Sequence, residues 1–485
     1  MGEALIDRPP GGVRRGWLAR RFQRGQPDNL ATWQLMAYGL PALPLQAMIA
    51  PISLFLAPFF TGHYGITLSS WALIVGLGSI ADVVANPIIG IVCDRLPSRW
   101  GRRRHWVVAA TPSLMLACAL LFTPQYFTSK PTFWYVLVGM MLFNISSAMQ
   151  NLNISAWGGE LSGRYAERSR IQGWRAAMGS ISRLMAFGIP AAMEFFTPHA
   201  TLGDKLQVLM WTAIVLMPLS ILIAVVSVPE QPADDLPVVS TRPSFTIGEF
   251  FSTLRRMVTN KYLGWILLVD VLQAGPFAVK SALFIFYVSF IMKAPGVSST
   301  LLLFVYSAAV LSMPIWLWVA KGREKHRILA ISVLLYGASQ ASMLFWGPNQ
   351  MVFFICAIAF HGAMNAGPSF LMQSIMADIV DSDTVLSGKP QTGAFFAVLE
   401  STTKLMPSLM VMAIFPLLQA LHFDPHGLHN TPQSLNALRI TFALAPTIPI
   451  LLASLLLWNF PLGSKRQGEL RAQIEALRAS RRTPT

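Results

Sequence analysis

Charge is the property that this 485-residue sequence most lacks, since only 12% of its residues are Asp, Glu, Lys or Arg. Soluble globular proteins carry about 25%. Hydrophobic residues make up 54% of the chain, and the mean hydropathy is +0.52. This combination excludes an ordinary soluble domain and predicts that much of the chain lies in a lipid bilayer.

Cysteines and enzyme motifs are also scarce. The three cysteines, Cys93, Cys118 and Cys356, lie in apolar segments, and their spacing matches neither a disulfide framework nor a metal site. No HExxH, GxSxG, phosphate-loop or dinucleotide motif occurs. We therefore predict a protein that is not an enzyme and that needs no metal and no organic cofactor.

Apolar windows of about 20 residues, the length that crosses a bilayer, recur along the chain. We predict an all-α membrane protein with twelve spans at 33–60, 70–93, 105–123, 132–157, 171–196, 206–228, 262–291, 297–320, 328–346, 351–376, 392–421 and 437–460. No apolar segment precedes the first span, so we expect no removable signal peptide.

A longer polar segment divides these spans into two sets of six. The predicted regions are a basic N-terminus (1–32), a first bundle (33–228), a central loop (229–261), a second bundle (262–460) and a basic tail (461–485). This layout is typical of transporters that bind their substrate between two halves, near the middle of the membrane.

Positive charge is abundant but uneven. The chain has 37 Lys and Arg against 22 Asp and Glu, and 29 of the 37 lie in the termini and alternate loops. Positively charged loops stay in the cytoplasm, so we predict that both termini are cytoplasmic. The net charge of +15 then reflects topology rather than nucleic-acid binding. We expect a monomer in the cytoplasmic (inner) membrane of a bacterium.

The segment 81–104 holds a polar pair and a basic cluster. Asp82 and Asn86 lie four residues apart within an apolar helix and therefore share one face. A charge at bilayer depth costs about 2.5–3.5 kcal/mol, so an acid there usually faces a solute pathway. Arginines follow immediately, which places this end of the helix at the cytoplasmic surface.

These residues also carry a family resemblance. The pattern GxxxDR followed by GRR, at 90–103, resembles the loop between the second and third spans of the major facilitator superfamily. Its form SRWGR, at 98–102, is similar to that of the glycoside–pentoside–hexuronide:cation symporters, the melibiose-permease branch. The segments 160–175 and 378–393 resemble two further loops of that family. The resemblance implies a major facilitator fold of two six-helix bundles.

The resemblance also implies where a coupling cation binds. In the family two acids on the second span bind it; here Asp82 occupies the first position and Asn86 the second. A single acid near Arg175 or Lys404 suits a proton better than sodium, so of the two candidate coupling ions we favour H⁺ over Na⁺. Glu400, four residues before Lys404, either neutralises that lysine or adds a second titratable acid.

A substrate site between the halves is implied as well. The family's positions fall on Gln46, Asn151, Ser155, Arg175 and Lys404. The amides at 46 and 151 replace carboxylates, so hydrogen bonding is retained and charge is lost. We add Asp270 in the seventh span. Lys280 lies ten residues later, ~15 Å along a helix, too far for a direct ion pair with Asp270. His361 is either a hydrogen-bonded core residue or a proton relay.

Charged residues at the cytoplasmic ends have two interpretations. They either only set the topology, or they form a cytoplasmic gate whose ion pairs break on inward opening, as the resemblance implies. The predicted gate residues are Asp94, Arg95, Arg102, Arg103, Asp381 and Asp383.

We therefore predict a cation-coupled symporter that moves a sugar, a glycoside or a similar small polar solute across the bilayer by alternating access. Two alternatives keep the same fold: an uncoupled facilitator, and a carrier of amphipathic solutes such as lysolipids or glycosylated metabolites. A sensor that transports nothing is a further alternative.

Overall fold

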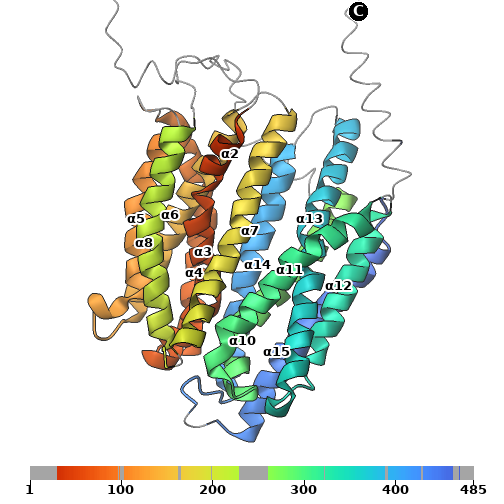
Figure 1. Cartoon of the computed structure of the whole chain (residues 1–485). Coiled ribbons are helices and arrows are strands. Elements are labelled where there is room, and N and C mark those ends of the chain that lie inside the picture. The colour runs from red at the N-terminus through yellow and green to blue at the C-terminus, as the bar shows by residue number, and fades with distance from the viewer. Residues whose placement is uncertain are drawn as a thin grey trace, which may run out of the picture.

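A computed structural model of the chain describes residues 30–96, 98, 103–161, 165–197, 199–228, 260–321, 323–387, 392–427, 430–462 and 469. The regular elements of these residues are helices, which confirms the predicted all-α fold (Figure 1). The central loop predicted at 229–261 lies almost entirely outside the described residues.

The first half contains α2 (Thr32–Gly39), α3 (Ala42–His63), α4 (Leu68–Arg95), α5 (Arg104–Phe122), α6 (Phe133–Glu160), α7 (Tyr165–Phe196) and α8 (Leu202–Ser227). The second half contains α10 (Lys261–Phe286), α11 (Ser298–Ala320), α12 (Lys325–Ser342), α13 (Met351–Ser387), α14 (Thr392–Ala420) and α15 (Pro432–Trp458). A π-helical turn, Tyr287–Ile291, extends α10.

Local chemistry sets several of these boundaries. Thr67, Thr132, Thr201 and Thr431 begin their helices by accepting a hydrogen bond from a backbone N–H of the first turn. The predicted first span is broken between α2 and α3 at Pro41, which has no N–H to continue the helix.

Eleven of the helices that the structure describes are long and apolar enough to cross a membrane. The predicted span at 328–346 is not among them, because α12 has only 18 residues and begins with Lys325, His326 and Arg327. The count of twelve spans therefore stays a prediction.

The two halves meet along three pairs of helices: α3 with α10, α4 with α14, and α7 with α11. We call the end of the bundle that holds Thr32 and Trp458 the terminal end, and the end that holds Thr67 and Thr201 the far end (Figure 1).

Among the described residues, one large apolar core includes buried residues of both halves, such as Phe55, Phe187, Phe286 and Phe415. A smaller core near the terminal end contains only residues of the second half. Apolar packing between the halves is therefore concentrated toward the far end.

Candidate functional site

A cavity of about 640 Å³ lies between the halves. Helices α3, α4 and α6 line it from the first half, and α10, α13 and α14 from the second. Its volume lies within the range of about 300–1,000 Å³ that is usual for small-molecule sites. The polar residues of its wall include Asp82, Asn144, Asn151, Asp270, Gln273, Asn365, Thr403 and Lys404.

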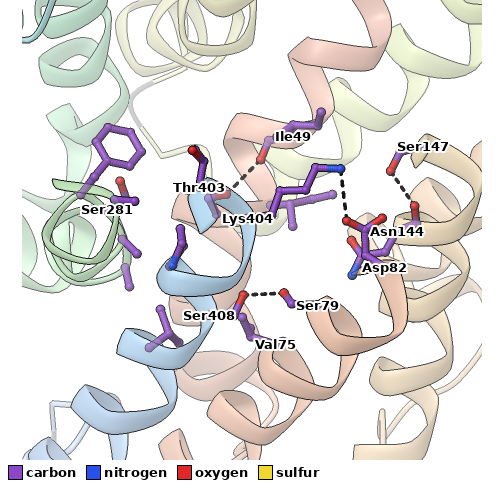
Figure 2. Close-up of a pocket in the computed structure, with 18 of the residues that line it drawn as sticks. Ile49, Val75, Ser79, Asp82, Asn144, Ser147, Ser281, Thr403, Lys404 and Ser408 are labelled. Carbon is purple, nitrogen blue, oxygen red and sulfur yellow. Dashed lines mark hydrogen bonds and ion pairs between the residues drawn. The ribbon is translucent and has the colours of Figure 1, made fainter. Parts of the chain in front are cut away.

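An ion pair crosses this cavity from one half to the other. Lys404 Nζ, on α14, lies 3.4 Å from Asp82 Oδ2, on α4 (Figure 2). The Asp82 side chain is 16% exposed and that of Lys404 is 40% exposed, so the acid is the more buried member of the pair. The Ser79 and Ser408 hydroxyls form a second bond between the same helices.

The predicted partners of Asp82 differ in their placement. Asn86 Nδ2 donates to the backbone oxygen of Asp82, at 2.8 Å, and not to its carboxylate. Asn86 Oδ1 is buried and has no hydrogen-bond partner among the described residues. The side chain of Glu400 lies outside the described part of the chain, so the structure places Lys404 with Asp82 and leaves the Glu400 prediction untested.

Three residues predicted for the substrate site lie together. Arg175 Nη1 donates to Ser155 Oγ at 2.6 Å, and Arg175 Nη2 donates to Asn151 Oδ1. Of the three, Asn151 lines the cavity. Gln46 lies apart from the described cavity wall, at the contact of α3 with α7, where its Cγ faces Gly179.

Asp270 and Lys280 have separate partners, as their spacing requires. Asp270 is buried, and its Oδ2 accepts a hydrogen bond from Thr403 Oγ1 at 3.0 Å. Lys280 Nζ lies 3.0 Å from His361 Nε2. The latter contact belongs to a polar cluster within the second half.

The predicted gate is only partly described. Arg102 lies outside the described residues, and so do the side chains of Asp94, Arg95 and Asp381, whose backbones belong to α4 and α13. Arg103 is buried, and Asp383 Oδ1 accepts a hydrogen bond from Asn260 Nδ2 at 3.5 Å. The cytoplasmic gate stays a prediction.

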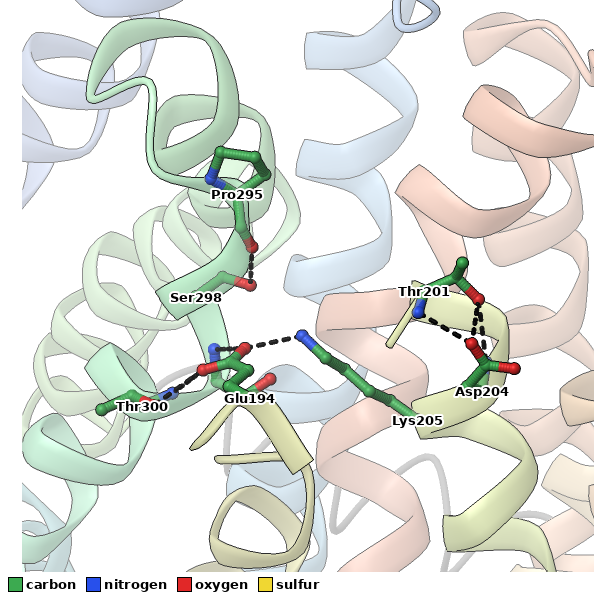
Figure 3. Close-up of polar contacts among 8 residues, drawn as sticks. Glu194, Thr201, Asp204, Lys205, Pro295, Ser298 and Thr300 are labelled. Atoms are coloured by element: carbon green, nitrogen blue, oxygen red, sulfur yellow. Dashed lines mark hydrogen bonds and ion pairs between the residues drawn. The ribbon is translucent and has the colours of Figure 1, made fainter. Parts of the chain in front are cut away.

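A carboxylate joins the halves at the far end, at a position that the sequence did not single out. Glu194, at the end of α7, accepts hydrogen bonds from the backbone N–H groups of Ser299 and Thr300, both at 2.8 Å (Figure 3). Thr300 Oγ1 donates to it at 2.7 Å, and so does Lys205 Nζ, also at 2.7 Å. The side chains of Glu194 and Lys205 are 4% and 5% exposed.

This clasp, formed by Glu194, Lys205, Ser299 and Thr300, caps a helix from a distance. The first N–H groups of a helix have no partner within it, and an anion there is favoured by the helix dipole. The residue before α11, Val297, makes no side-chain cap. Glu194 of the other half caps these N–H groups instead. It is more than 100 residues away in the sequence, so no local spacing could predict this contact.

Residues 37–464 match the sequence family described as MFS/sugar transport protein. The chain belongs to the major facilitator superfamily. Within it, the chain is a member of the glycoside–pentoside–hexuronide:cation symporter family, which confirms the resemblance found in the loops. The family consists of transporters, not enzymes, and the protein is a multi-pass membrane protein.

Two relatives match nearly the full length. An uncharacterized symporter of Synechocystis sp. is 22% identical and covers 91% of this chain and 96% of its own. A protein of Xenopus tropicalis, named sodium-dependent lysophosphatidylcholine symporter 1, is 19% identical, and the match covers 96% of this chain and 95% of that protein. The solved structure of a D-xylose–proton symporter matches with a TM-score of 0.63 at 13% identity, and the match covers 90% of this chain and 98% of that one. This likeness shows that the major facilitator fold is shared.

Proposed function

We propose that this symporter-family chain is a proton-coupled secondary transporter of a sugar, glycoside or similar small polar solute. It has twelve spans with both termini in the cytoplasm, works as a monomer in a bacterial inner membrane, and moves its solute by alternating access. The observation that carries the proposal is the Asp82–Lys404 ion pair, which joins the two halves at the wall of the cavity between them.

The pair connects cation binding to movement of the halves. While Asp82 is ionised, its attraction to Lys404 holds α4 against α14. When a proton binds, an O–H bond forms on the carboxyl group, its negative charge is lost and the attraction to Lys404 falls. The Ser79–Ser408 hydrogen bond then holds this interface without support from the ion pair.

The residue beside Asp82 favours a proton over sodium. A metal cation prefers several oxygen ligands, carboxylates among them. Here Asn86 directs its amide nitrogen to the Asp82 backbone and brings no second carboxylate. A proton needs only the one acid.

The cavity wall suits a solute with both hydroxyl groups and apolar surface. Asn144, Asn151 and Gln273 supply amide donors and acceptors, which match sugar hydroxyls. Apolar and aromatic residues fill much of the remaining wall, among them Trp71, Phe143 and Phe277. The likeness to a lysophosphatidylcholine symporter favours an amphipathic solute as the second candidate.

A binding screen identifies the solute class. We would measure the thermal unfolding of purified protein with melibiose, methyl β-D-glucuronide and lysophosphatidylcholine, at pH 5.5 to 8 and with or without Na⁺. A ligand raises the unfolding temperature by mass action. Stabilisation by either sugar supports the main proposal, and stabilisation by the lysolipid alone favours the second candidate.

The coupling residue is tested with the same solute in proteoliposomes. We expect Asp82→Asn to lose uphill uptake driven by a pH gradient while it retains counterflow, because the amide binds no proton near neutral pH. Asp204→Asn, which changes a carboxylate at the exposed start of α8, is the matched control. Uphill uptake that survives in Asp82→Asn with its pH dependence intact would disprove the assignment. Uptake driven by a Na⁺ gradient alone would show that the coupling ion is sodium and not the proton.

A further inference from the structure

The second half contains a buried basic pair that the transport mechanism above does not use. Lys280 Nζ, on α10, lies 3.0 Å from His361 Nε2, on α13, and 3.2 Å from the Tyr336 hydroxyl. His361 is 3% exposed, and the Tyr336 ring stacks on its imidazole with ring centres 4.2 Å apart. Both bases are thus held in one place by neighbouring aromatic rings.

Hydrogen-bond directions define the protonation of this pair. An ammonium group only donates, so His361 Nε2 accepts from Lys280. Nδ1 then carries the imidazole hydrogen and donates to Ser339 Oγ at 2.8 Å, and Ser339 donates to the Tyr336 backbone oxygen at 2.7 Å. In this arrangement the two bases share a single positive charge.

No anion balances that charge among the described residues. The Tyr336 hydroxyl of α12 lies beside Lys280. The residues that line the small cavity around the pair include Leu54 of α3, Tyr306 of α11 and Phe442 of α15. On α10 itself, Asp270 is bonded to Thr403.

Two further charged residues of the surrounding helices are also cations. Arg183 of α7 is basic, and Lys404 of α14 is paired with Asp82. A second proton on the Lys280–His361 pair would place two cations 3.0 Å apart without a carboxylate, which is strongly unfavourable at low dielectric.

The pair borders the main cavity. Ser281 lines both the main cavity and the small cavity beside Lys280. Phe277, a residue of the main cavity wall, lies under the ammonium group, with Nζ 4.8 Å from its ring centre. The pair therefore lies directly behind residues that form the wall of the main cavity.

We propose that Lys280 and His361 form a second proton-binding site, which holds one shared proton within the second half and exchanges it with water of the main cavity. On release an N–H bond of Nζ breaks, its electron pair stays on the nitrogen and the proton passes to water, so that the site becomes neutral. Its use in coupling rests on the transport function proposed above, whereas the binding of the proton does not.

The test observes the imidazole directly and needs no solute. Purified protein with ¹⁵N-labelled histidine is studied by NMR from pH 5.5 to 8.5, and the signals of His361 are assigned by their loss in His361→Gln. In the wild type we expect a neutral ring with its hydrogen on Nδ1. In Lys280→Met the ring takes the proton itself, so an imidazolium signal appears at pH values where the wild type shows none.

Two controls keep the result interpretable. Lys293→Met, which alters an exposed lysine outside this cluster, should leave the His361 signals unchanged. Should Lys280→Met not fold, Lys280→Arg serves instead, because a guanidinium stays charged and must keep His361 neutral throughout.

Three results would overturn the site: a wild-type His361 that becomes charged like an exposed histidine, a hydrogen on Nε2 in place of Nδ1, or a response to pH that Lys280→Met leaves unaltered. A failure of proton-driven uptake in the wild type would refute the proposed function instead and would leave the NMR outcome standing.

Discussion

The Glu194 clasp at the far end makes a quantitative prediction about alternating access. Opening the far end must separate α7 from α11, and the carboxylate then loses its three hydrogen bonds to Ser299 and Thr300. The Glu194–Lys205 pair is unaffected, since both residues belong to the first half. The clasp therefore stabilises the closed far end specifically.

The magnitude follows from the number of bonds. A hydrogen bond to a charged group contributes about 1.5–3 kcal/mol, and hydration of the separated groups offsets part of the total, so we assign ~3 kcal/mol to the three bonds together. Glu194→Gln keeps one acceptor oxygen but turns an amide NH₂ group toward the donors of α11. We expect it to remove about 2 kcal/mol, which is a change of roughly 30-fold in favour of the open far end.

Spin labels measure this equilibrium directly. Lys130 and Asn349 are both exposed and lie in opposite halves. Each is replaced by cysteine in a Cys356→Ala background, and the two new cysteines are spin-labelled. The distribution of distances between the two labels is recorded by pulsed electron resonance. Glu194→Gln should increase a longer-distance population that is minor in the parent protein. Thr300→Val, which removes one hydroxyl donor, should increase it less.

The matched control is Asp204→Asn, whose carboxylate caps α8 beside the clasp without reaching the second half (Figure 3). If Glu194→Gln and Asp204→Asn give the same distances as the parent, the three hydrogen bonds contribute nothing to closing the far end, and the reasoning is refuted.

Two further predictions concern packing and the substrate site. Asn151→Asp should place a carboxylate against Arg175. Because charge-assisted hydrogen bonds are roughly twice as strong as neutral ones, we expect the free energy of unfolding to increase by about 1 kcal/mol and the unfolding temperature to rise. Asn153→Asp places a carboxylate in a buried position without a cation and should lower the unfolding temperature instead. Gly362→Ala should reduce folded protein sharply, since its methyl group would collide with the Val305 backbone oxygen, whereas Gly264→Ala meets open space and should be tolerated. Both pairs are compared by thermal unfolding and size-exclusion chromatography.

Much of the architecture was predictable because its causes are local. A bilayer span needs about 20 apolar residues in succession, and that pattern is visible without any tertiary contact. Loop motifs identified the family for the same reason. The third predicted span in the second half, at 328–346, shows where this signal weakens: Lys325–Ser342 is short and polar at its start, so its apolar character does not by itself predict a membrane helix.

The site was predictable only in part. The family resemblance assigned Arg175, Asn151 and Ser155 to the substrate site, and the structure brings the three side chains together. Asn86 was expected at the second cation-binding position, on the same helix face as Asp82. A neighbour at four residues also offers a backbone oxygen, however, and the amide bonds to that oxygen instead.

The sequence by itself determined that this chain is a helical membrane transporter of a known family, because apolar length and loop motifs are properties of short segments. Only the tertiary structure decided that Lys404 pairs with Asp82, that Glu194 caps α11 and that Lys280 donates a hydrogen bond to His361. Each of these contacts joins residues separated by about 80 to more than 300 positions, and such charges find partners only through the packing of helices.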